Sequence, residues 1–208
     1  MTGKGQWIDV ALFDSCAAFL ANQAMNYLAT GESPGRLGNA HPNIVPYQTF
    51  KTRDGSIILA CGNDNLFNKF CEVAGCVHLA QDPRYSTNAE RVKHREEITR
   101  LLDEIFARRV TREWVELLDG AGVPTGPINS VAQVFQEPQA VARGLKIELD
   151  HATAGKVALV ASPMRFSGTP IAYGLAPPAL GQHTDEILRD TLGMSAAQIA
   201  RLRENGVV

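Results

Sequence analysis

The segment from Trp7 to Leu28 places the strongest constraint on how this chain can fold. It contains no Gly or Pro, is rich in Ala and Leu, and is followed by Gly31 and Pro34, so it predicts one long helix. Its apolar residues are spread around the helix and are not confined to one stripe. Because a helix that is apolar on nearly all sides has to be covered on several of them, the sequence predicts a partner surface for this segment.

Length and composition are those of a globular protein. The chain has 208 residues, of which 45% are hydrophobic and 20% are charged. A chain of this size buries roughly 70% of its unfolded surface, so it needs no disulfide scaffold and is neither disordered nor collagen-like. The 20 basic and 22 acidic residues nearly cancel, to a net charge of -2. We therefore predict no nucleic-acid partner and no membrane partner.

The compartment is predicted from the N-terminal residues and the cysteines. Residues 1–6 lack the apolar core of a signal peptide, and no segment is apolar for long enough to cross a bilayer. The four cysteines form no CxxC pair and no Cys/His ligand pattern, which favours buried free thiols and no bound metal. We expect a cytoplasmic protein. The cysteines are Cys16, Cys61, Cys71 and Cys76.

Helices and strands are both predicted in the rest of the chain. Residues 47–51 alternate polar and apolar side chains and lead through a turn at residues 53–55 to apolar residues 56–61, which predicts a β-hairpin. Thr87 and Ser195 are each followed three residues later by Glu or Gln, the pattern of a capping box. The other predicted elements are a helix capped by Asn63 or Asp64, a helix over 87–106 with a solvated charged face, a helix capped by Thr111, a stiff loop over 123–127, short helices over 130–135 and 138–143, strands over 145–149 and 156–160, an extended linker over 163–178 and a helix over 184–192.

These elements predict an α+β chain in three parts. A linking helix and loop occupy residues 1–46, and a small mixed domain with antiparallel strands occupies residues 47–162. An extended linker and C-terminal helices occupy residues 163–208. Both ends of the chain are expected to pack against a further surface, and we expect self-association, which a strictly monomeric mass in light scattering would contradict.

The common catalytic motifs are absent. The sequence contains no phosphate-binding loop, no GxSxG and no HExxH. Asp9 and Asp14 lie five residues apart, so they do not share a helix face. The position of Asp9 near a predicted helix start favours helix-end electrostatics, and Asp14 is interpreted as facing a partner. His94 lies among charged residues and is predicted to be exposed to solvent.

The loop from Gly38 to Tyr47 is the most site-like segment. Glycine allows the backbone to approach a ligand closely, and Pro42 and Pro46 stiffen the remainder. The loop also joins two predicted parts of the chain, a position where pockets often form. An ordinary connection between the two parts is the alternative interpretation.

Several segments, taken in chain order, resemble the class III CoA-transferase (CaiB/BaiF) family from one end of the chain to the other. The sequence around His41 is most similar to the dicarboxylate type of that family, the succinyl-CoA:glutarate type. It lacks the run of glycines that the formyl-CoA type carries in this loop. The segments that carry the resemblance are residues 2–15 (TGKGQWIDVALFDS), 38–50 (GNAHPNIVPYQTF), 54–55 with 62–64, 87–92 (TNAERV), 121–128 (AGVPTGPI), 135–139 (FQEPQ) and 177–184 (PPALGQHT).

The resemblance implies a CoA-transferase that moves CoA between a thioester and a free carboxylic or dicarboxylic acid. It implies an aspartate nucleophile that forms a mixed anhydride and then an enzyme thioester. In the family this aspartate lies upstream of the TGxGQ segment, so we expect no catalytic residue in this chain and no activity from it alone. The resemblance further implies a Rossmann-like large domain, missing here, against which the chain packs, and an interlocked homodimer.

The same resemblance places the substrate-binding residues in the loop. His41, Pro42, Asn43 and Ile44 are expected to form part of the acyl pocket wall, with His41 and Asn43 hydrogen-bonding an acceptor carboxylate. No prosthetic group is implied, and coenzyme A enters as a thioester substrate. Two alternatives stay open: a CoA-ester racemase of the α-methylacyl-CoA type in the same family, and a non-catalytic module that binds acyl-CoA or another subunit.

Overall fold

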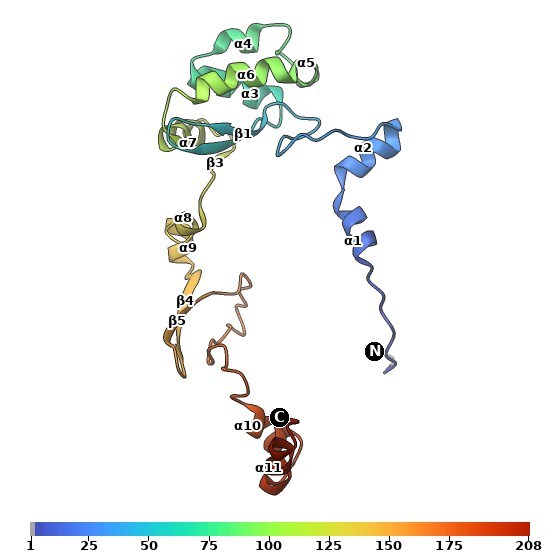
Figure 1. Ribbon diagram of the computed structural model, residues 1–208. Helices are drawn as coiled ribbons and strands as arrows, with labels where there is room; N and C mark the ends of the chain where they lie inside the picture. The colour runs from blue at the N-terminus through green and yellow to red at the C-terminus, as the bar shows by residue number, and fades with distance from the viewer. Residues whose placement is uncertain (1–2) are drawn as a thin grey trace. The chain divides into compact units, whose positions relative to one another are not determined.

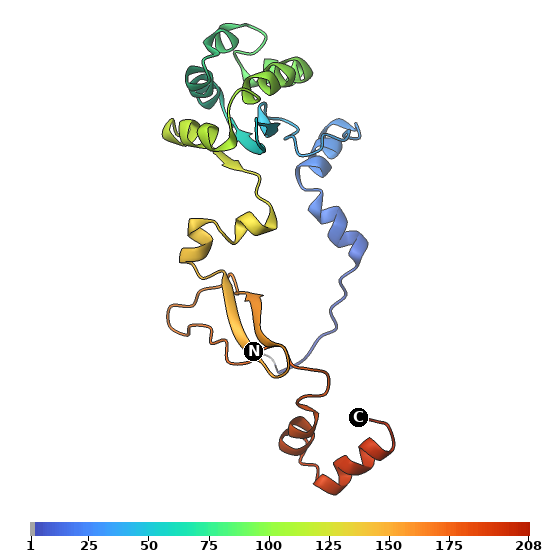
Figure 2. The same ribbon diagram turned by 60° about the vertical axis from the view of Figure 1, so that its left-hand side comes forward.

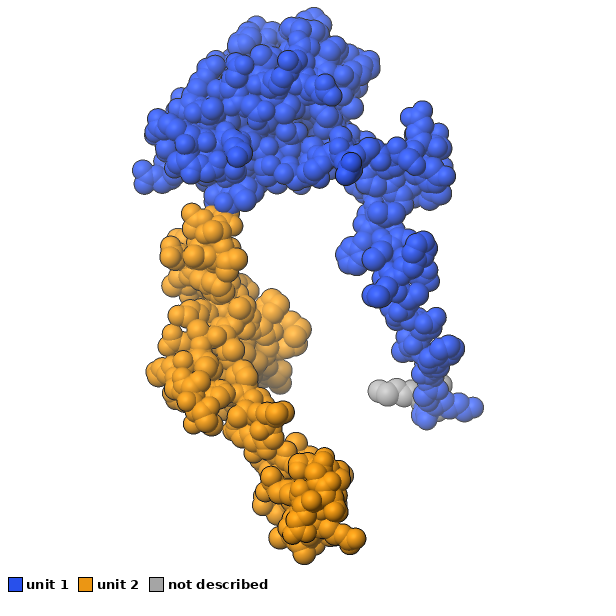
Figure 3. All heavy atoms as spheres, in the orientation of Figure 1, with its two compact units in different colours: residues 1–128 blue, residues 129–208 orange. Residues whose placement is uncertain are grey.

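The computed structural model describes residues 3–208 and divides the chain into two compact units, residues 1–128 and residues 129–208 (Figure 3). The described part of the chain has no helix that is long and apolar enough to cross a membrane. The three-part division at residues 46 and 162 stays a prediction. Each compact unit is described below by itself.

The first unit begins with two short helices in place of the single long helix that the sequence predicts. Helix α1 spans Leu12–Phe19 and helix α2 spans Asn22–Thr30, and between them Ala21 adopts a φ of 43°. Neither helix contains a buried residue, and Trp7 and Phe19 are 90% and 89% exposed. A helix in water depends mainly on the packing of its apolar face, so nothing in the described chain holds these residues in one continuous helix.

A three-stranded antiparallel sheet with the order β1-β2-β3 forms the centre of the first unit. Strands β1 (Tyr47–Lys51) and β2 (Ser56–Ala60) form the predicted hairpin, with Phe50 opposite Ile57. Strand β3 (Thr125–Pro127) lies where the sequence predicts a loop, and that prediction is wrong. Three residues that include Gly and Pro carry no alternating pattern, and β3 is recognisable only from its pairing with β2.

The first unit contains five further helices, shown in teal to yellow-green in Figure 1, of which α6 and α7 contact the strands. The side chain of Asn63 accepts from the Leu66 N–H and caps the first of them, as predicted, and Thr87 accepts from the Glu90 N–H. The predicted helix over residues 87–106 is divided at His94. This histidine is partly buried, not exposed, and its ring meets the edge of Tyr85. The five helices are α3 (Asp64–Ala74), α4 (Val77–Gln81), α5 (Asn88–Lys93), α6 (Arg95–Phe106) and α7 (Thr111–Gly120).

Stacked aromatic rings hold the helices to the sheet. Phe106 lies 4.8 Å from Phe50 of β1, 5.6 Å from Phe70 of α3 and 4.9 Å from Trp114 of α7, measured between ring centroids. The Trp114 indole N–H donates to the Phe106 carbonyl at 2.9 Å, which satisfies the buried polar atom of that ring. The core of the first unit is therefore continuous from the strands to α3, α6 and α7.

Helix α7 is capped by a residue distant in the sequence, not by Thr111 as the sequence predicts. Thr111 is the first residue of the helix, and its N–H and hydroxyl both donate to Asp54 Oδ1, at 2.7 and 2.9 Å. Asp54 lies in the β1–β2 turn, where its carboxylate takes the place of a local cap. Thr52 Oγ1 lies 2.7 Å from Thr111 Oγ1 and completes the cluster.

The second unit has little buried apolar surface of its own. Strands β4 (Lys146–His151) and β5 (Gly155–Val160) form an antiparallel hairpin, shown in orange in Figure 2. The buried hydrophobic residues of this unit are Ala161 and Ile199. The predicted helix over residues 184–192 is a short α-turn followed by a π-helix. Its helices are α8 (Val131–Val134), α9 (Pro138–Ala142), α10 (Thr184–Glu186), the π-helix η1 (Ile187–Thr191) and α11 (Ala196–Glu204).

The observed fold is thus a mixed one with antiparallel strands and helices, as predicted. The first helix, strand β3 and the helices over residues 87–106 and 184–192 differ from the prediction in detail. Ser130 and Ser195 both close full capping boxes, the second of which the sequence predicts. Residues 161–183 contain no helix or strand, in keeping with the predicted extended linker. The expected packing against a Rossmann-like domain stays a prediction.

Candidate functional site

The loop that the sequence singles out is folded back on itself. The His41 N–H donates to the Tyr47 carbonyl at 2.9 Å, and the His41 ring stacks on the Tyr47 ring at 5.4 Å. The Asn43 N–H donates to His41 Nδ1 at 3.1 Å. An acceptor Nδ1 fixes the neutral ring with its proton on Nε2, so Nε2–H is the group of His41 that remains for a ligand.

Three side chains from α5 and the start of α6 hold the backbone of this loop. Asn88 accepts from the Val45 N–H at 3.0 Å and donates to the Asn43 carbonyl at 2.8 Å. Arg91 donates through Nε to the Val45 carbonyl at 2.6 Å. Arg95 donates through Nη2 to the Pro42 carbonyl at 2.7 Å. The conformation of the predicted site is therefore set by residues that lie more than forty positions later in the chain.

Arg91 lies at the centre of this arrangement. Its side chain is fully buried, and it also donates to the Tyr85 carbonyl at 2.8 Å and to Asp64 Oδ1 at 2.8 Å. The guanidinium lies over the Phe67 ring, 4.3 Å from its centroid. All three nitrogens of the group have an acceptor, which is what a buried arginine requires.

The four predicted substrate-binding residues are neighbours, but several of their polar groups are already engaged. The Pro42 and Asn43 carbonyls accept from Arg95 and Asn88, and the Asn43 side-chain amide donates to Asn26 at 3.3 Å. Ile44 is partly buried. The expected substrate contacts of these residues stay predictions.

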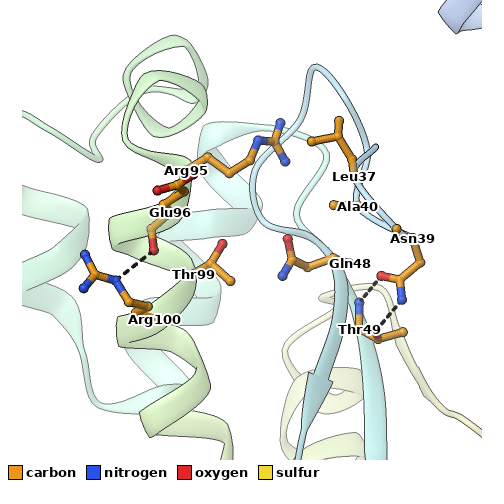
Figure 4. A pocket seen from close by; sticks show the side chains of 10 residues that line it. Leu37, Asn39, Ala40, Gln48, Thr49, Arg95, Glu96, Thr99 and Arg100 are labelled. Atoms are coloured by element: carbon orange, nitrogen blue, oxygen red, sulfur yellow. Dashed lines mark hydrogen bonds between the residues drawn. The ribbon is translucent and has the colours of Figure 1, made fainter. Parts of the chain in front are cut away.

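An open groove of about 760 Å³ lies between residues 37–40, strand β1 and helix α6 (Figure 4). Gln48 and Thr49 of β1 form one wall, and Asn39 fastens the loop to that wall through two hydrogen bonds with Thr49, of 2.6 and 3.0 Å. Helix α6 forms the opposite wall. The α6 residues that line the groove are Arg95, Glu96, Thr99 and Arg100.

The buried Cys61 thiol is not suited to act as a nucleophile. Cys61, Cys71 and Cys76 are buried, as predicted, whereas Cys16 is exposed on α1. Burial raises the pKa of the Cys61 thiol to about 12, so it is protonated at neutral pH. Within residues 3–208 no three His, Cys, Asp or Glu side chains are grouped so that they could hold a metal ion.

The sequence analysis did not identify the residues whose side chains hold the backbone of this loop. It assigned no role to Arg91 or Arg95, whose guanidinium groups donate to the backbone of the loop. The available signal is the spacing of Asn88, Arg91 and Arg95, which lie three and four positions apart and so share one helical face. Such a row of donors indicates a common acceptor, but the sequence does not show that the acceptor is the loop backbone.

Comparison with known proteins identifies the family of this chain. Residues 1–184 match the model of CoA-transferase family III. The chain is 41% identical to the human succinyl-CoA:glutarate CoA-transferase over all of its length and 47% of that protein. It is 42% identical to the succinate–glutarate CoA-transferase of Agrobacterium fabrum over 91% of this chain and 47% of that one. The crystal structure of a CaiB/BaiF family protein from Brucella suis, 48% identical, matches with a TM-score of 0.74 over 91% of this chain and 49% of that one.

These relatives are transferases that act on CoA thioesters and dicarboxylic acids, and the comparisons do not favour the racemase alternative. The chain spans about half the length of the curated relatives it matches. With its mixed fold and its match across residues 1–184, the chain belongs to CoA-transferase family III, the CaiB/BaiF family.

Proposed function

We propose that this chain supplies the small domain and part of the acid-binding wall of a CoA-transferase that moves CoA between a thioester and a dicarboxylic acid. The observation that carries the proposal is the likeness, over its whole length, to the human succinyl-CoA:glutarate CoA-transferase. The loop that contains His41 to Ile44 also supports the proposal. Hydrogen bonds from Asn88, Arg91 and Arg95 to its backbone hold it in place, as a wall of a binding site requires. The homodimer and the cytoplasmic location stay predictions.

The proposed chemistry uses an aspartate outside residues 1–208. Its carboxylate attacks the thioester carbonyl, the C–S bond breaks, and CoA thiolate leaves a mixed anhydride. The thiolate then attacks the aspartyl carbonyl, which releases the donor acid and leaves an enzyme thioester. The acceptor carboxylate then attacks the enzyme thioester, which releases CoA thiolate and forms a second mixed anhydride. The thiolate attacks the acyl carbonyl of the acceptor, which gives the new CoA thioester and frees the aspartate. Covalent catalysis divides one difficult acyl exchange into easier steps and requires that water be excluded.

This chain contributes to those steps through the loop. His41 Nε2–H would donate to the acceptor carboxylate, because Nδ1 already accepts from the Asn43 N–H. The hydrogen bond orients the acid and leaves the chemistry to the aspartate. Replacing His41 with Ala should therefore raise the KM for the acceptor more than it lowers kcat.

A chimera tests the proposal. Residues 1–208 replace the matching segment of the Agrobacterium fabrum relative, and CoA exchange between succinyl-CoA and glutarate is measured for the chimera and for the 208-residue chain alone. We expect exchange by the chimera and none by the chain alone. A folded chimera that binds glutarate without exchange would favour the non-catalytic module. An unchanged KM for the acceptor in the His41→Ala chimera would show that His41 has only a structural role.

A further inference from the structure

We propose that the groove between residues 37–40 and helix α6 binds a carboxylate group of the substrate acid, with Arg95 as its main contact. This inference rests on the proposed function, and it assigns to Arg95 the carboxylate of a dicarboxylic acid that does not receive CoA. Arg91 is not among the residues that line this groove, and several polar groups of the lining have no hydrogen-bond partner in the described structure.

Arg95 has an incomplete set of hydrogen-bond partners. Nη2 donates to the Pro42 carbonyl, but Nη1 is enclosed and has no hydrogen-bond partner. Among residues 3–208 no carboxylate forms an ion pair with it, whereas Arg91 four positions earlier is paired with Asp64. A partly buried guanidinium without a counter-ion is costly, and a ligand carboxylate in the groove would supply the missing negative charge.

Burial also lowers the pKa of the Arg95 guanidinium below its usual value, and no nearby anion opposes that shift. The group nevertheless stays protonated at neutral pH, because an arginine pKa lies far above 7. A positive charge enclosed in this way is stabilised by an entering anion more than an exposed charge is, since water screens it less.

Further donors line the same groove. In the described structure the side chains of Gln48 and Thr99 make no hydrogen bond, and they line opposite walls of the groove in Figure 4. The Thr49 hydroxyl accepts from Asn39, so its own proton remains available. Arg100 makes only a long contact of 3.4 Å with the Glu96 carbonyl. An amide, two hydroxyls and two guanidinium groups can therefore donate to an acid in this groove.

The charge of the groove favours a carboxylate over a phosphate. Arg95 and Arg100 carry two positive charges, and Glu96 carries one negative charge in the same lining, which leaves a net charge of about +1. A single carboxylate balances that charge, whereas a phosphate dianion would leave an excess of negative charge beside Glu96. The planar guanidinium also matches the planar carboxylate.

Calorimetric titration of the 208-residue chain tests the site directly. Glutarate is the probe, uncharged glutaramide is the neutral control, and inorganic phosphate is the competing anion. We expect glutarate to bind and glutaramide not to bind, with a loss of affinity of about tenfold or more in Arg95→Gln. A smaller loss is expected in Thr99→Val, because in the described structure the Thr99 side chain makes no hydrogen bond to the loop. Arg112→Gln removes an exposed arginine on α7 and should leave binding unchanged.

Three results would overturn the assignment: no binding of glutarate, equal binding by Arg95→Gln, or tighter binding of phosphate than of glutarate. The chimera provides a second readout, the ratio of kcat/KM for glutarate to that for butyrate. We expect Arg95→Gln to reduce this ratio about tenfold, whereas a merely loosened loop would reduce both values together. An active chimera with an unchanged ratio refutes this inference alone, and an inactive chimera with Arg95-dependent glutarate binding refutes the proposed function alone.

Discussion

Two arginines beneath the same loop have different environments. Arg91 is fully buried, donates to three acceptors and lies against the Phe67 ring. Arg95 is partly buried, donates to one acceptor and lines an open groove. Both contact the loop backbone, at Val45 and Pro42, so a contact with the loop alone does not separate a structural arginine from a ligand-binding one.

The two arginines are distinguished by whether every guanidinium nitrogen has a hydrogen-bond partner. A buried charge without acceptors costs several kcal/mol, so a structural arginine is expected to have a partner for every nitrogen, as Arg91 does. Arg95 has an enclosed nitrogen without a partner, and the part of the chain that the structure describes offers it no carboxylate. The arrangement around Arg91 therefore stabilises the fold, whereas the charge of Arg95 can still pair with the carboxylate of a bound acid.

The largest effect is expected when Arg91 is replaced. Arg91→Met should lower the free energy of unfolding by about 3–5 kcal/mol, because the buried Val45 and Tyr85 carbonyls lose their donors. Arg95→Met is the matched substitution, and it should cost clearly less, since it removes a single carbonyl partner together with an uncompensated charge. Urea denaturation followed by Trp114 fluorescence measures both, because Trp114 lies in the core of the first unit.

Equal losses in the two variants would contradict the comparison, because they would give Arg95 the same structural role as Arg91. A larger loss for Arg95→Met would reverse it. Trp7 is 90% exposed, so its emission changes little on unfolding and does not obscure the signal from Trp114.

A smaller effect is expected at Asn88, which holds the same loop without a charge. Asn88→Ala removes the acceptor of the Val45 N–H and the donor to the Asn43 carbonyl, and should cost about 1–2 kcal/mol. Hydrogen exchange of the Val45 amide, followed by NMR, should accelerate in the variant. Asn68→Ala, at an exposed position on α3, is the control. Unchanged exchange at Val45 would show that the arginines order the loop without Asn88.

Local patterns in the sequence predicted the β1–β2 hairpin and the caps at Asn63 and Ser195. In each case the signal lies within a few residues: an alternation around Asp54-Gly55, or a polar residue three positions before the N–H that it accepts from. The loop from Gly38 to Tyr47 was singled out from its glycine and proline content, and residues 38–40 of it line the groove.

Features that depend on distant residues were not predictable in this way. The β3 strand is defined by pairing with β2, and the cap of α7 comes from Asp54, 57 positions before Thr111. The roles of Arg91 and Arg95 depend on a loop more than forty residues away. The break at Ala21 has the opposite cause, because the predicted continuous helix needs a covering surface that the described chain does not provide.

The smallest effect is expected at Asp54, which accepts several hydrogen bonds through Oδ1 but lies at the surface, where water competes for the same groups. The Thr111 N–H and hydroxyl and the Thr52 hydroxyl hold the pKa of the Asp54 carboxyl below its usual value of 3.8. Because the folded-state pKa is lower than the unfolded one, this contribution is fully present above the unfolded pKa. It is lost as the pH falls through the folded pKa.

Asp54→Asn should therefore lower the urea midpoint most at pH 7, and the difference from the parent chain should shrink as the carboxyl is protonated in strong acid. Glu113→Gln, at an exposed position in the first turn of α7, is the control for a general change of charge at that helix end. A pH-independent difference would show that the carboxylate charge contributes nothing to the cap. A loss as large as that of Arg91→Met would show that exposure to water does not weaken the hydrogen bonds of a charged side chain, and would contradict the expected order of these effects.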